Sequence, residues 1–416
     1  MIYQPRVADT ELSSRLCAAG AVVIEGPKAC GKTETARRVA ASAVLLDVDQ
    51  AAQQALAIDP SLVLEGPVPR LLDEWQVAPG LWNHVRRAVD TRGTPGQFIL
   101  TGSAVPADDA RRHAGSGRFS TLRMRPMTLF ETGHSLGTIS LAALFGGESA
   151  RSAEPPLTIA DLADRLTVGG WPAHQQLTVP AAARAARDYL AQIRLVDVGR
   201  LGGSAHDPLR MERLLKSIAR NVATEAPITM LTADTDGGIG ALSRTTVSEY
   251  LSVLERLMII EDQPAWSTHL RSRATLRTTP KRHFVDPSLA VAALAAGPQQ
   301  LLRDLRFMGL LFESLVVRDL RVHAQALDGQ VYHYRDSSGL EVDAVIQLAD
   351  GRWGAVEVKL GAGMVHAAAA SLSKFATIVD TTVCGDPAFL AVITGDGFGY
   401  RREDGIQVIP VGALAP

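Results

Sequence analysis

Apolar runs and helically spaced stretches alternate in the N-terminal third of the chain. Short apolar runs at residues 21–25, 44–49, 69–76 and 97–103 predict buried strands. Residues 34–43 follow the first run with a helical pattern. Strands that alternate with helices are typical of a parallel sheet, so this part of the chain predicts an α/β fold.

Helical spacing dominates the middle of the chain, at residues 181–198 and 209–226. A further helix begins near Ser243, a residue suited to cap it, and places Val247, Leu251, Leu254 and Met258 on one face. Short strands are predicted after it, at residues 258–261 and 263–266. This order of helices followed by strands is typical of a winged helix.

The C-terminal part predicts a second α/β region. Its helical stretch is followed by two alternating strands around an Asp-Ser-Ser-Gly turn. The predicted order is helix, three strands, helix and strand, at residues 310–326, 331–335, 341–347, 353–360, 364–378 and 389–394.

Length, charge and cysteine content narrow the class of protein. The 416 residues exceed the ~250–300 at which one core usually stops growing, so we expect two or three domains. No run of ~18 apolar residues could span a bilayer, and residues 1–15 lack the layout of a secretory signal. Three cysteines without close spacing argue against disulfides and structural zinc. We therefore expect a cytoplasmic protein with no membrane segment.

A glycine-rich motif follows the first predicted strand and precedes a predicted helix. Its pattern, GxxxxGKT, predicts a P-loop, in which backbone N–H groups surround the phosphates of a nucleotide. The lysine would reach the β- and γ-phosphates, and the threonine hydroxyl would bind Mg²⁺. The alternative is a plain glycine-rich turn. The motif comprises Gly26, Pro27, Lys28, Ala29, Cys30, Gly31, Lys32 and Thr33.

An Asp-Glu pair ends a later apolar strand and predicts a Walker B motif. Asp73 would hold Mg²⁺ through water, and Glu74 would activate the attacking water. Such a pair alone could also begin a helix. Its position after a P-loop favours the catalytic interpretation.

Further groups for phosphoryl transfer are predicted beyond the Walker B pair. Thr101 and Ser103 end the next strand, where a hydroxyl can sense the γ-phosphate or hold the lytic water. Arg118 lies on a glycine-flanked loop and could stabilise the charge of the transition state. A solvated loop arginine is the alternative.

These motifs carry a resemblance to a known family. The segments GPKACGKT, LLDEWQVAPGLW, FILTGS and LRMRPMTLFE, followed by GGWP at residues 169–172, resemble a prokaryotic family of AAA-type ATPases with a C-terminal domain of unknown function. The resemblance covers nearly the whole chain. It implies ATP as the nucleotide and a winged helix between the ATPase and C-terminal parts. Arg70 departs from it, because an apolar strand residue is expected there.

A basic segment follows the predicted winged helix. Residues 265–285 contain no acidic residue, although the net charge of the chain is −2. Basic side chains beside a polar helix start are suited to the backbone of double-stranded DNA, while a solvated loop joining two domains is the alternative. The candidate DNA contacts are Arg244, Arg271, Arg273, Arg277, Lys281 and Arg282.

Four C-terminal residues resemble the PD-(D/E)xK arrangement of restriction-endonuclease-like folds. Glu357 and Lys359 are two apart on one strand and therefore share a face, where Asp343 on a neighbouring strand could join them around Mg²⁺. Glu313 on the preceding helix is the fourth member, and Lys359 would activate water. A carboxylate–lysine pair that only forms salt bridges is the alternative.

We therefore predict an α/β chain of four parts. They are a P-loop AAA-like ATPase domain, a linker or helical region, a helical and winged-helix region, and a PD-(D/E)xK-like α/β domain, at residues 1–135, 136–180, 181–284 and 285–416.

The predicted function is Mg²⁺-dependent ATP hydrolysis coupled to DNA. Two alternatives stay open: a nucleotide-controlled switch that acts on a protein partner, of toxin–antitoxin or signalling type, and an ATP-regulated DNA endonuclease. Assembly into a homo-oligomer is also left open.

Overall fold

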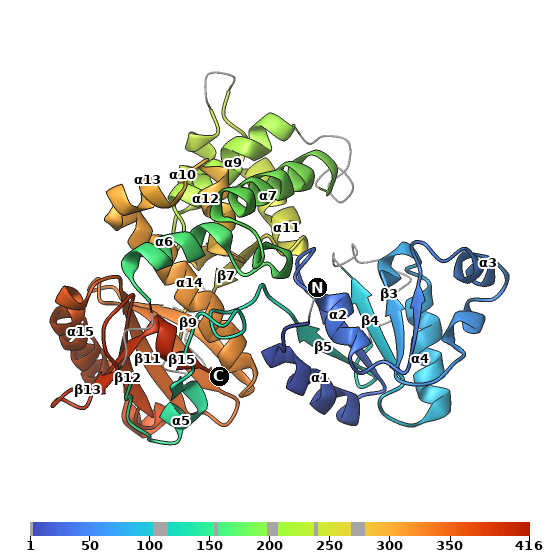
Figure 1. Cartoon of the computed structure of the whole chain (residues 1–416), viewed down its shortest axis with the longest axis horizontal. Helices are drawn as coiled ribbons and strands as arrows, with labels where there is room; N and C mark the ends of the chain where they lie inside the picture. The colour runs from blue at the N-terminus through green and yellow to red at the C-terminus, as the bar shows by residue number, and fades with distance from the viewer. Residues whose placement is uncertain (1–2, 103–114, 154–156, 198–206, 237–239, 268–278) are drawn as a thin grey trace. The chain divides into compact units, whose positions relative to one another are not determined.

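The computed structural model describes residues 3–102, 115–153, 157–197, 207–236, 240–267 and 279–416. It divides into two compact units (Figure 1). One consists of Met1–Pro126 with Arg256–Met258, and the other of Met127–Glu255 with Ile259–Pro416. No helix in the described parts of the chain has the length and apolar character needed to cross a bilayer.

The N-terminal unit is built on a five-stranded parallel sheet, as the alternating pattern predicts. The strand order is β2-β3-β4-β1-β5. The strands are β1 (Ala21–Glu25), β2 (Ser42–Leu45), β3 (Arg70–Asp73), β4 (Phe98–Gly102) and β5 (Phe119–Arg123). The helices around it are α1 (Val7–Ala18), α2 (Lys32–Arg37), α3 (Gln50–Ile58) and α4 (Leu81–Arg92), with short 3₁₀ turns η1 (Pro60–Leu64) and η2 (Trp75–Val77).

Alternation along β1 supplies both faces of this sheet. Val22 and Ile24 are buried with Leu12 of α1 on one face, and Val23 is buried with Val85 of α4 on the other. A strand whose residues are buried on both faces is expected in a parallel sheet that helices cover on both sides.

Two predicted elements have different bounds in this unit. Strand β2 ends at Leu45, not at residue 49, because Asp49 instead caps α3 by accepting the N–H groups of Ala51 and Ala52. Helix α2 ends at Arg37. Arg70 does begin a strand, and its guanidinium donates to the carbonyl of Val63 and the hydroxyl of Ser42.

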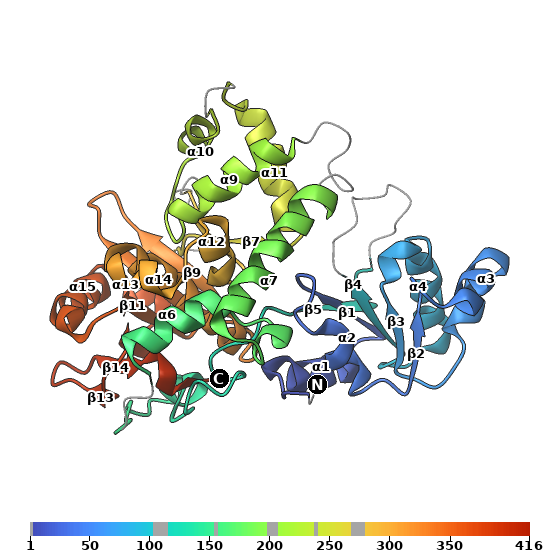
Figure 2. The same ribbon diagram turned by 45° about the horizontal axis from the view of Figure 1, so that its top comes forward.

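The middle of the chain is helical. It contains α5 (Leu141–Phe145), α6 (Ile159–Val168), α7 (Val179–Gln192) with a π-helical end (Ile193–Asp197), α9 (Pro208–Arg220), α10 (Ile228–Asp234), α11 (Arg244–Arg256), α12 (Pro287–Ala293) and α13 (Pro298–Arg303). Helix α12 packs against both α7 and α9 (Figure 2).

The strand predicted at residues 263–266 is wrong. Strand β7 (Ile260–Gln263) pairs instead with β8 (Lys281–Phe284) in an antiparallel two-stranded sheet. Ala265 forms only an isolated bridge to His333. The pairing joins segments far apart in sequence, which a local pattern cannot reveal.

The C-terminal part contains a mixed six-stranded sheet of order β13-β14-β12-β11-β10-β9. Its elements are α14 (Leu305–Gln325), β9 (Gly329–Arg335), β10 (Glu341–Leu348), β11 (Trp353–Lys359), α15 (Val365–Ile378), α16 (Thr381–Cys384), β12 (Phe389–Thr394), β13 (Tyr400–Arg401) and β14 (Gln407–Pro410). Inside the predicted linker, β6 (Ile139–Ser140) pairs with the last strand, β15 (Leu414–Ala415).

A buried ion network connects several motifs of the second unit. Arg318 pairs with Asp286 and Asp319, each at 2.7 Å. Asp286 also accepts the N–H of Gly170, and Asp319 accepts that of Leu129. Residues of the LRMRPMTLFE and GGWP segments therefore meet helices α12 and α14 at one site.

Candidate functional site

The P-loop connects β1 to α2 and is folded tightly in the described structure. A Cβ atom on Gly26 would lie 2.4 Å from the carbonyl oxygen of Met124, and Gly31 has a φ of 105°, so both positions favour glycine. The buried Lys32 ammonium donates to the carbonyls of Gly26 and Pro27, at 2.9 and 2.8 Å. The lysine is thus held over the loop on which a phosphate would bind.

Hydroxyl and carboxylate groups converge beside this loop. The Thr33 hydroxyl donates to Asp73 Oδ1 at 2.9 Å, and the buried Thr101 hydroxyl donates to the same oxygen. The contact arises because β4 lies between β1 and β3, so all three side chains stand at the carboxyl-terminal edge of the sheet. Oxygen ligands of this kind fit Mg²⁺.

Glu74 adopts the left-handed conformation, with a φ of 55°, directly after β3. Its carboxylate accepts a hydrogen bond from the side-chain amide of Gln76. The other end of that amide, Gln76 Oε1, is buried and has no hydrogen-bond partner within the described structure. The sequence alone gives Gln76 no role, although this residue lies inside the LLDEWQ motif.

Arg6 is a second residue whose contacts the sequence does not reveal. Its buried guanidinium donates to the carbonyls of Cys30 and Arg125, both at 2.8 Å. It therefore ties the P-loop to the segment after β5. No local motif marks Arg6, because both contacts are distant in sequence.

Arg118 stands at the opposite edge of the sheet from the P-loop. Its carbonyl accepts the N–H of Ala21, the first residue of β1, whereas the P-loop follows the last. The length of β1 separates the two sites, roughly 16 Å at ~3.3 Å per residue. Arg118 instead pairs with Asp90 at 2.8 Å. A transition-state role at the nucleotide site of its own chain is therefore wrong. Ser103 lies outside the described residues.

A second cluster of charges occupies the C-terminal sheet, and it contains all four residues of the predicted nuclease-like set. Glu313 comes from α14, Asp343 from β10, and Glu357 and Lys359 from β11. Lys359 Nζ lies 3.1 Å from Asp343 Oδ2 and 2.6 Å from Glu357 Oε2. The three carboxylates are buried.

A fifth member, Lys281 of β8, enters this cluster from the two-stranded sheet. Its Nζ lies 2.7 Å from Glu313 Oε1 and 3.5 Å from Asp343 Oδ1. The charges therefore alternate in the order Glu313, Lys281, Asp343, Lys359 and Glu357. We call these five residues the charge chain.

The position of each carboxylate in the charge chain explains its pKa. Burial raises the pKa of Asp343, but Lys281, Lys359 and the N–H of Val358 outweigh it, so the pKa lies below its ordinary value. Burial and the neighbouring Asp343 raise the pKa of Glu313 to about 7 and of Glu357 to about 8. Each of these two end carboxylates is paired with one lysine only, whereas Asp343 is paired with two.

The charge chain does not fit the predicted magnesium site. Among the described residues, no three His, Cys, Asp or Glu side chains are arranged to hold a metal ion. The Lys281 ammonium lies between Glu313 and Asp343, two of the carboxylates that would bind the magnesium ion.

The basic segment is only partly available to DNA. Lys281 and Arg282 are buried, the latter with its Nε 3.1 Å from Asp262 Oδ1, so their prediction as surface DNA contacts is wrong. From β8, Lys281 pairs with Glu313 and Asp343, and Arg282 pairs with Asp262. Arg244 is exposed at the start of α11. The other three candidates, Arg271, Arg273 and Arg277, lie outside the described residues.

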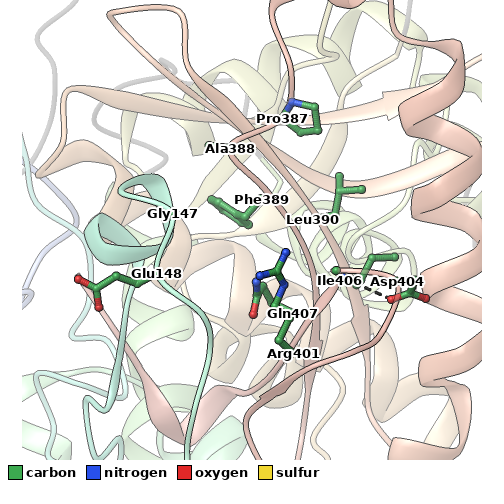
Figure 3. Close-up of a pocket in the computed structure, with 11 residues that line it drawn as sticks. Gly147, Glu148, Pro387, Ala388, Phe389, Leu390, Arg401, Asp404, Ile406 and Gln407 are labelled. Atoms are coloured by element: carbon green, nitrogen blue, oxygen red, sulfur yellow. Dashed lines mark hydrogen bonds between the residues drawn. The ribbon is translucent and has the colours of Figure 1, made fainter.

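A pocket of about 250 Å³ lies near the β13–β14 edge of the C-terminal sheet (Figure 3). Arg401 and Gln407, which face each other across β13 and β14, line it together with Phe389. It includes none of the residues that the sequence predicts for a site.

Three known families match successive parts of this chain. Residues 18–133 match an AAA domain, residues 159–300 match a domain of unknown function (DUF8612), and residues 308–414 match another (DUF4143).

Two mycobacterial proteins are similar to this chain over most of its length. Uncharacterized proteins of Mycobacterium tuberculosis and Mycobacterium bovis are each 24% identical over 416 residues, which is 99% of this chain and 84% of the relative. Among solved structures, a Walker-type ATPase of Pyrococcus abyssi is 11% identical, with a TM-score of 0.42, and the match covers 70% of this chain and 96% of that one.

The AAA match spans the sheet that carries the P-loop and Asp73, and the DUF4143 match spans most of the charge chain. The matches therefore support an AAA-type P-loop ATPase with a C-terminal domain of unknown function.

Proposed function

We propose that the protein binds ATP together with Mg²⁺ and hydrolyses it. The observation that carries this proposal is the convergence of Thr33, Asp73 and Thr101 beside the P-loop. Thr33 and Asp73 would hold the magnesium ion, which supplies charge neutralisation at the phosphates.

The residues of the chain then have distinct roles in the proposed reaction. Lys32 exchanges its two loop carbonyls for phosphate oxygens, and the backbone N–H groups of the loop donate to the same phosphates. Glu74 accepts a proton from the attacking water, and the Thr101 hydroxyl holds the Asp73 carboxylate in orientation. The leaving group is ADP.

ATP turnover of purified protein tests this proposal. Lys32→Ala and Glu74→Gln should each lower kcat by at least ~100-fold, because they remove a phosphate ligand and the general base. Arg118→Ala serves as a matched control on the same domain and should leave the turnover of isolated chains unchanged. Unchanged turnover in both Lys32→Ala and Glu74→Gln would contradict the proposal, because the activity would then come from another site or a contaminant.

We propose DNA as the partner to which this turnover is coupled. Helices α9, α10 and α11 followed by the β7–β8 pair have the element order of a winged helix, and Arg244 is exposed at the start of α11. The inward-facing Lys281 and Arg282 reduce this support, so a switch that acts on a protein partner is the main rival.

DNA affinity measured at two salt concentrations separates these two functions. Coupling to DNA requires binding that weakens steeply with salt, turnover that rises with duplex, and weaker binding in Arg244→Ala. Turnover that is indifferent to duplex, with no salt-sensitive binding, would favour the protein partner.

The endonuclease alternative has less support than either. The charge chain contains the residues of a PD-(D/E)xK set, but an ammonium group lies where a metal would be needed. Mg²⁺-dependent cleavage of DNA that disappears in Asp343→Ala and Lys359→Ala would favour the endonuclease alternative.

A further inference from the structure

A second pocket, of about 220 Å³, lies where α12 packs against α7 and α9 (Figure 2). Its lining residues belong neither to the nucleotide site nor to the charge chain. Apolar side chains from all three helices line it, namely Leu190, Leu215, Ala292 and Ala293. The alanines explain the hollow, because larger side chains on α12 would fill the space that they leave. We call it the α7–α9 pocket.

Basic side chains surround the same pocket. Arg187 and Arg194 are seven positions apart, on one face of α7 and its π-helical end, and Lys216 comes from α9. Among the described residues that line the pocket, Glu212 is the one carboxylate, and it pairs with Arg194 and with Lys216, the latter at 2.8 Å. The exposed Arg187 forms no ion pair within the described parts of the chain. Three positive charges therefore face one negative charge.

The positive charge continues along both helices beyond the pocket. Arg184 precedes Arg187 by three positions on α7, and Arg220 follows Lys216 by four on α9, so each extends a row of exposed cations. Asp188 is also exposed on α7, but it does not line the pocket. A concave site whose surroundings carry mainly one sign of charge attracts ligands of the opposite sign.

Size and polarity together select the class of ligand. Pockets that bury a drug-sized molecule usually measure ~300–1,000 Å³, so about 220 Å³ suits a smaller group, such as one large apolar side chain. A nucleic-acid backbone would use the cations but would leave the apolar lining without a partner. A protein segment can satisfy both features, with an apolar anchor in the pocket and carboxylates paired with the cations around it.

We propose that the α7–α9 pocket binds an acidic segment of a partner protein. The segment inserts one large apolar side chain against Leu190 and Leu215, and its carboxylates pair with Arg187 and Lys216. Glu212 holds Lys216 in position, while Arg187 gains its first ion pair. The inference goes beyond the proposed ATP hydrolysis and depends neither on it nor on the proposed DNA contacts.

Selection of random dodecapeptides displayed on phage tests the proposal. The full-length wild type and the double variant Arg187→Glu with Lys216→Glu serve as baits, after circular dichroism has established that both are folded. The wild type should enrich peptides in which a Leu, Ile, Phe or Met is flanked on both sides by Asp or Glu. The double variant should not enrich them, because its own carboxylates would repel them.

The most enriched peptide is then synthesised, and its Kd is measured by fluorescence anisotropy. Arg187→Glu alone should weaken binding by roughly tenfold, because an attraction becomes a repulsion. Ala293→Leu, which fills the pocket and keeps its charges, should weaken binding by at least ~30-fold, because the anchor loses its place. Lys374→Glu on α15 is the matched control, since it reverses an exposed charge that does not line the pocket, and it should leave Kd unchanged.

The absence of acidic peptides among those enriched on the wild type would overturn the proposal. Equal affinity of the enriched peptide for the wild type and Ala293→Leu would also overturn it, because charge alone would then explain binding. If Ala293→Leu does not fold, Ala191→Leu fills the pocket from α7 and takes its place. Salt-sensitive binding of duplex DNA that the double variant loses and Ala293→Leu retains would instead show that this surface binds nucleic acid.

Discussion

At the residue scale, Gln76 donates a hydrogen bond to the carboxylate of Glu74, the proposed general base. A carboxylate can only accept hydrogen bonds, so the Gln76 NH₂ must face Glu74, and Oε1 must face away from it. A buried acceptor without a partner costs ~1–3 kcal/mol and calls for an explanation. Orientation of Glu74 for its proposed role as general base offers one.

We expect Gln76→Leu to lower kcat for ATP by roughly tenfold, about the value of one charge-assisted hydrogen bond, with a smaller change in KM. Steady-state kinetics and the pH profile of kcat measure this, because Glu74 loses its donor. Gln53→Leu is the control, because the exposed Gln53 lies on α3 and its side-chain amide donates, among the described residues, only to the carbonyl of Asp47, before that helix. Equal kcat values for the two variants would contradict a positioning role.

Gly170 shows how a single missing Cβ decides packing. A Cβ there would lie 2.0 Å from the carbonyl oxygen of Met127, a clash that only a shift of the backbone could relieve. We expect Gly170→Ala to lower the free energy of unfolding by ~2–3 kcal/mol. Gly309→Ala in α14 is the matched control. A Cβ at this position meets no atom within 4 Å, so the substitution should raise the free energy of unfolding by ~0.5–1 kcal/mol. Urea denaturation compares them, and equal effects would refute the steric argument.

At the scale of elements, the Arg318 network joins α12 and α14 to segments from two earlier motifs. Arg318→Met removes one partner of two buried carboxylates, Asp286 and Asp319. We expect a loss of ~3–5 kcal/mol, because uncompensated charges would stay buried. Arg402→Met, which breaks the largely exposed pair with Asp404, should cost below ~1 kcal/mol in the same denaturation experiment. A similar cost for both would show that the network is not essential to the packing.

The charge chain joins β8, β10, β11 and α14, and it predicts how stability depends on pH. Glu313 and Glu357 hold their protons in the folded protein up to pKa values of about 7 and 8, whereas an ordinary glutamate loses its proton near 4.5. Between these values the unfolded chain binds fewer protons than the folded one. Rising pH therefore lowers the free energy of unfolding across this window.

Thermal unfolding of the wild type and of Glu313→Gln between pH 5 and about 8 measures this effect. The variant cannot ionise at this position, so its stability should fall less as the pH rises. Asp343 acts in the opposite sense, because its pKa is lowered, and its contribution is lost only in acid. Parallel curves for the two proteins would exclude Glu313 as a source of the pH dependence.

At the scale of the whole molecule, the structure brings together residues that the sequence keeps far apart. Four strands of the N-terminal sheet and the helix after the P-loop follow from short-range patterns, since each is marked by its own apolar spacing. The charge chain instead joins residues 281 and 359, and its lysine comes from a segment that the sequence pattern marks only as basic.

Local chemistry therefore determined the P-loop, the Asp-Glu pair, four strands of each large sheet and the grouping of Asp343, Glu357 and Lys359. These features follow from periodicity and from motifs whose members are close in sequence or on adjacent strands. Only the tertiary structure decided that Arg118 stands away from the nucleotide loop, that Gln76 holds Glu74, and that Lys281 faces inward. Strand order and the direction of a buried charge depend on which distant segments pair, and pairing is settled by the burial of the whole chain.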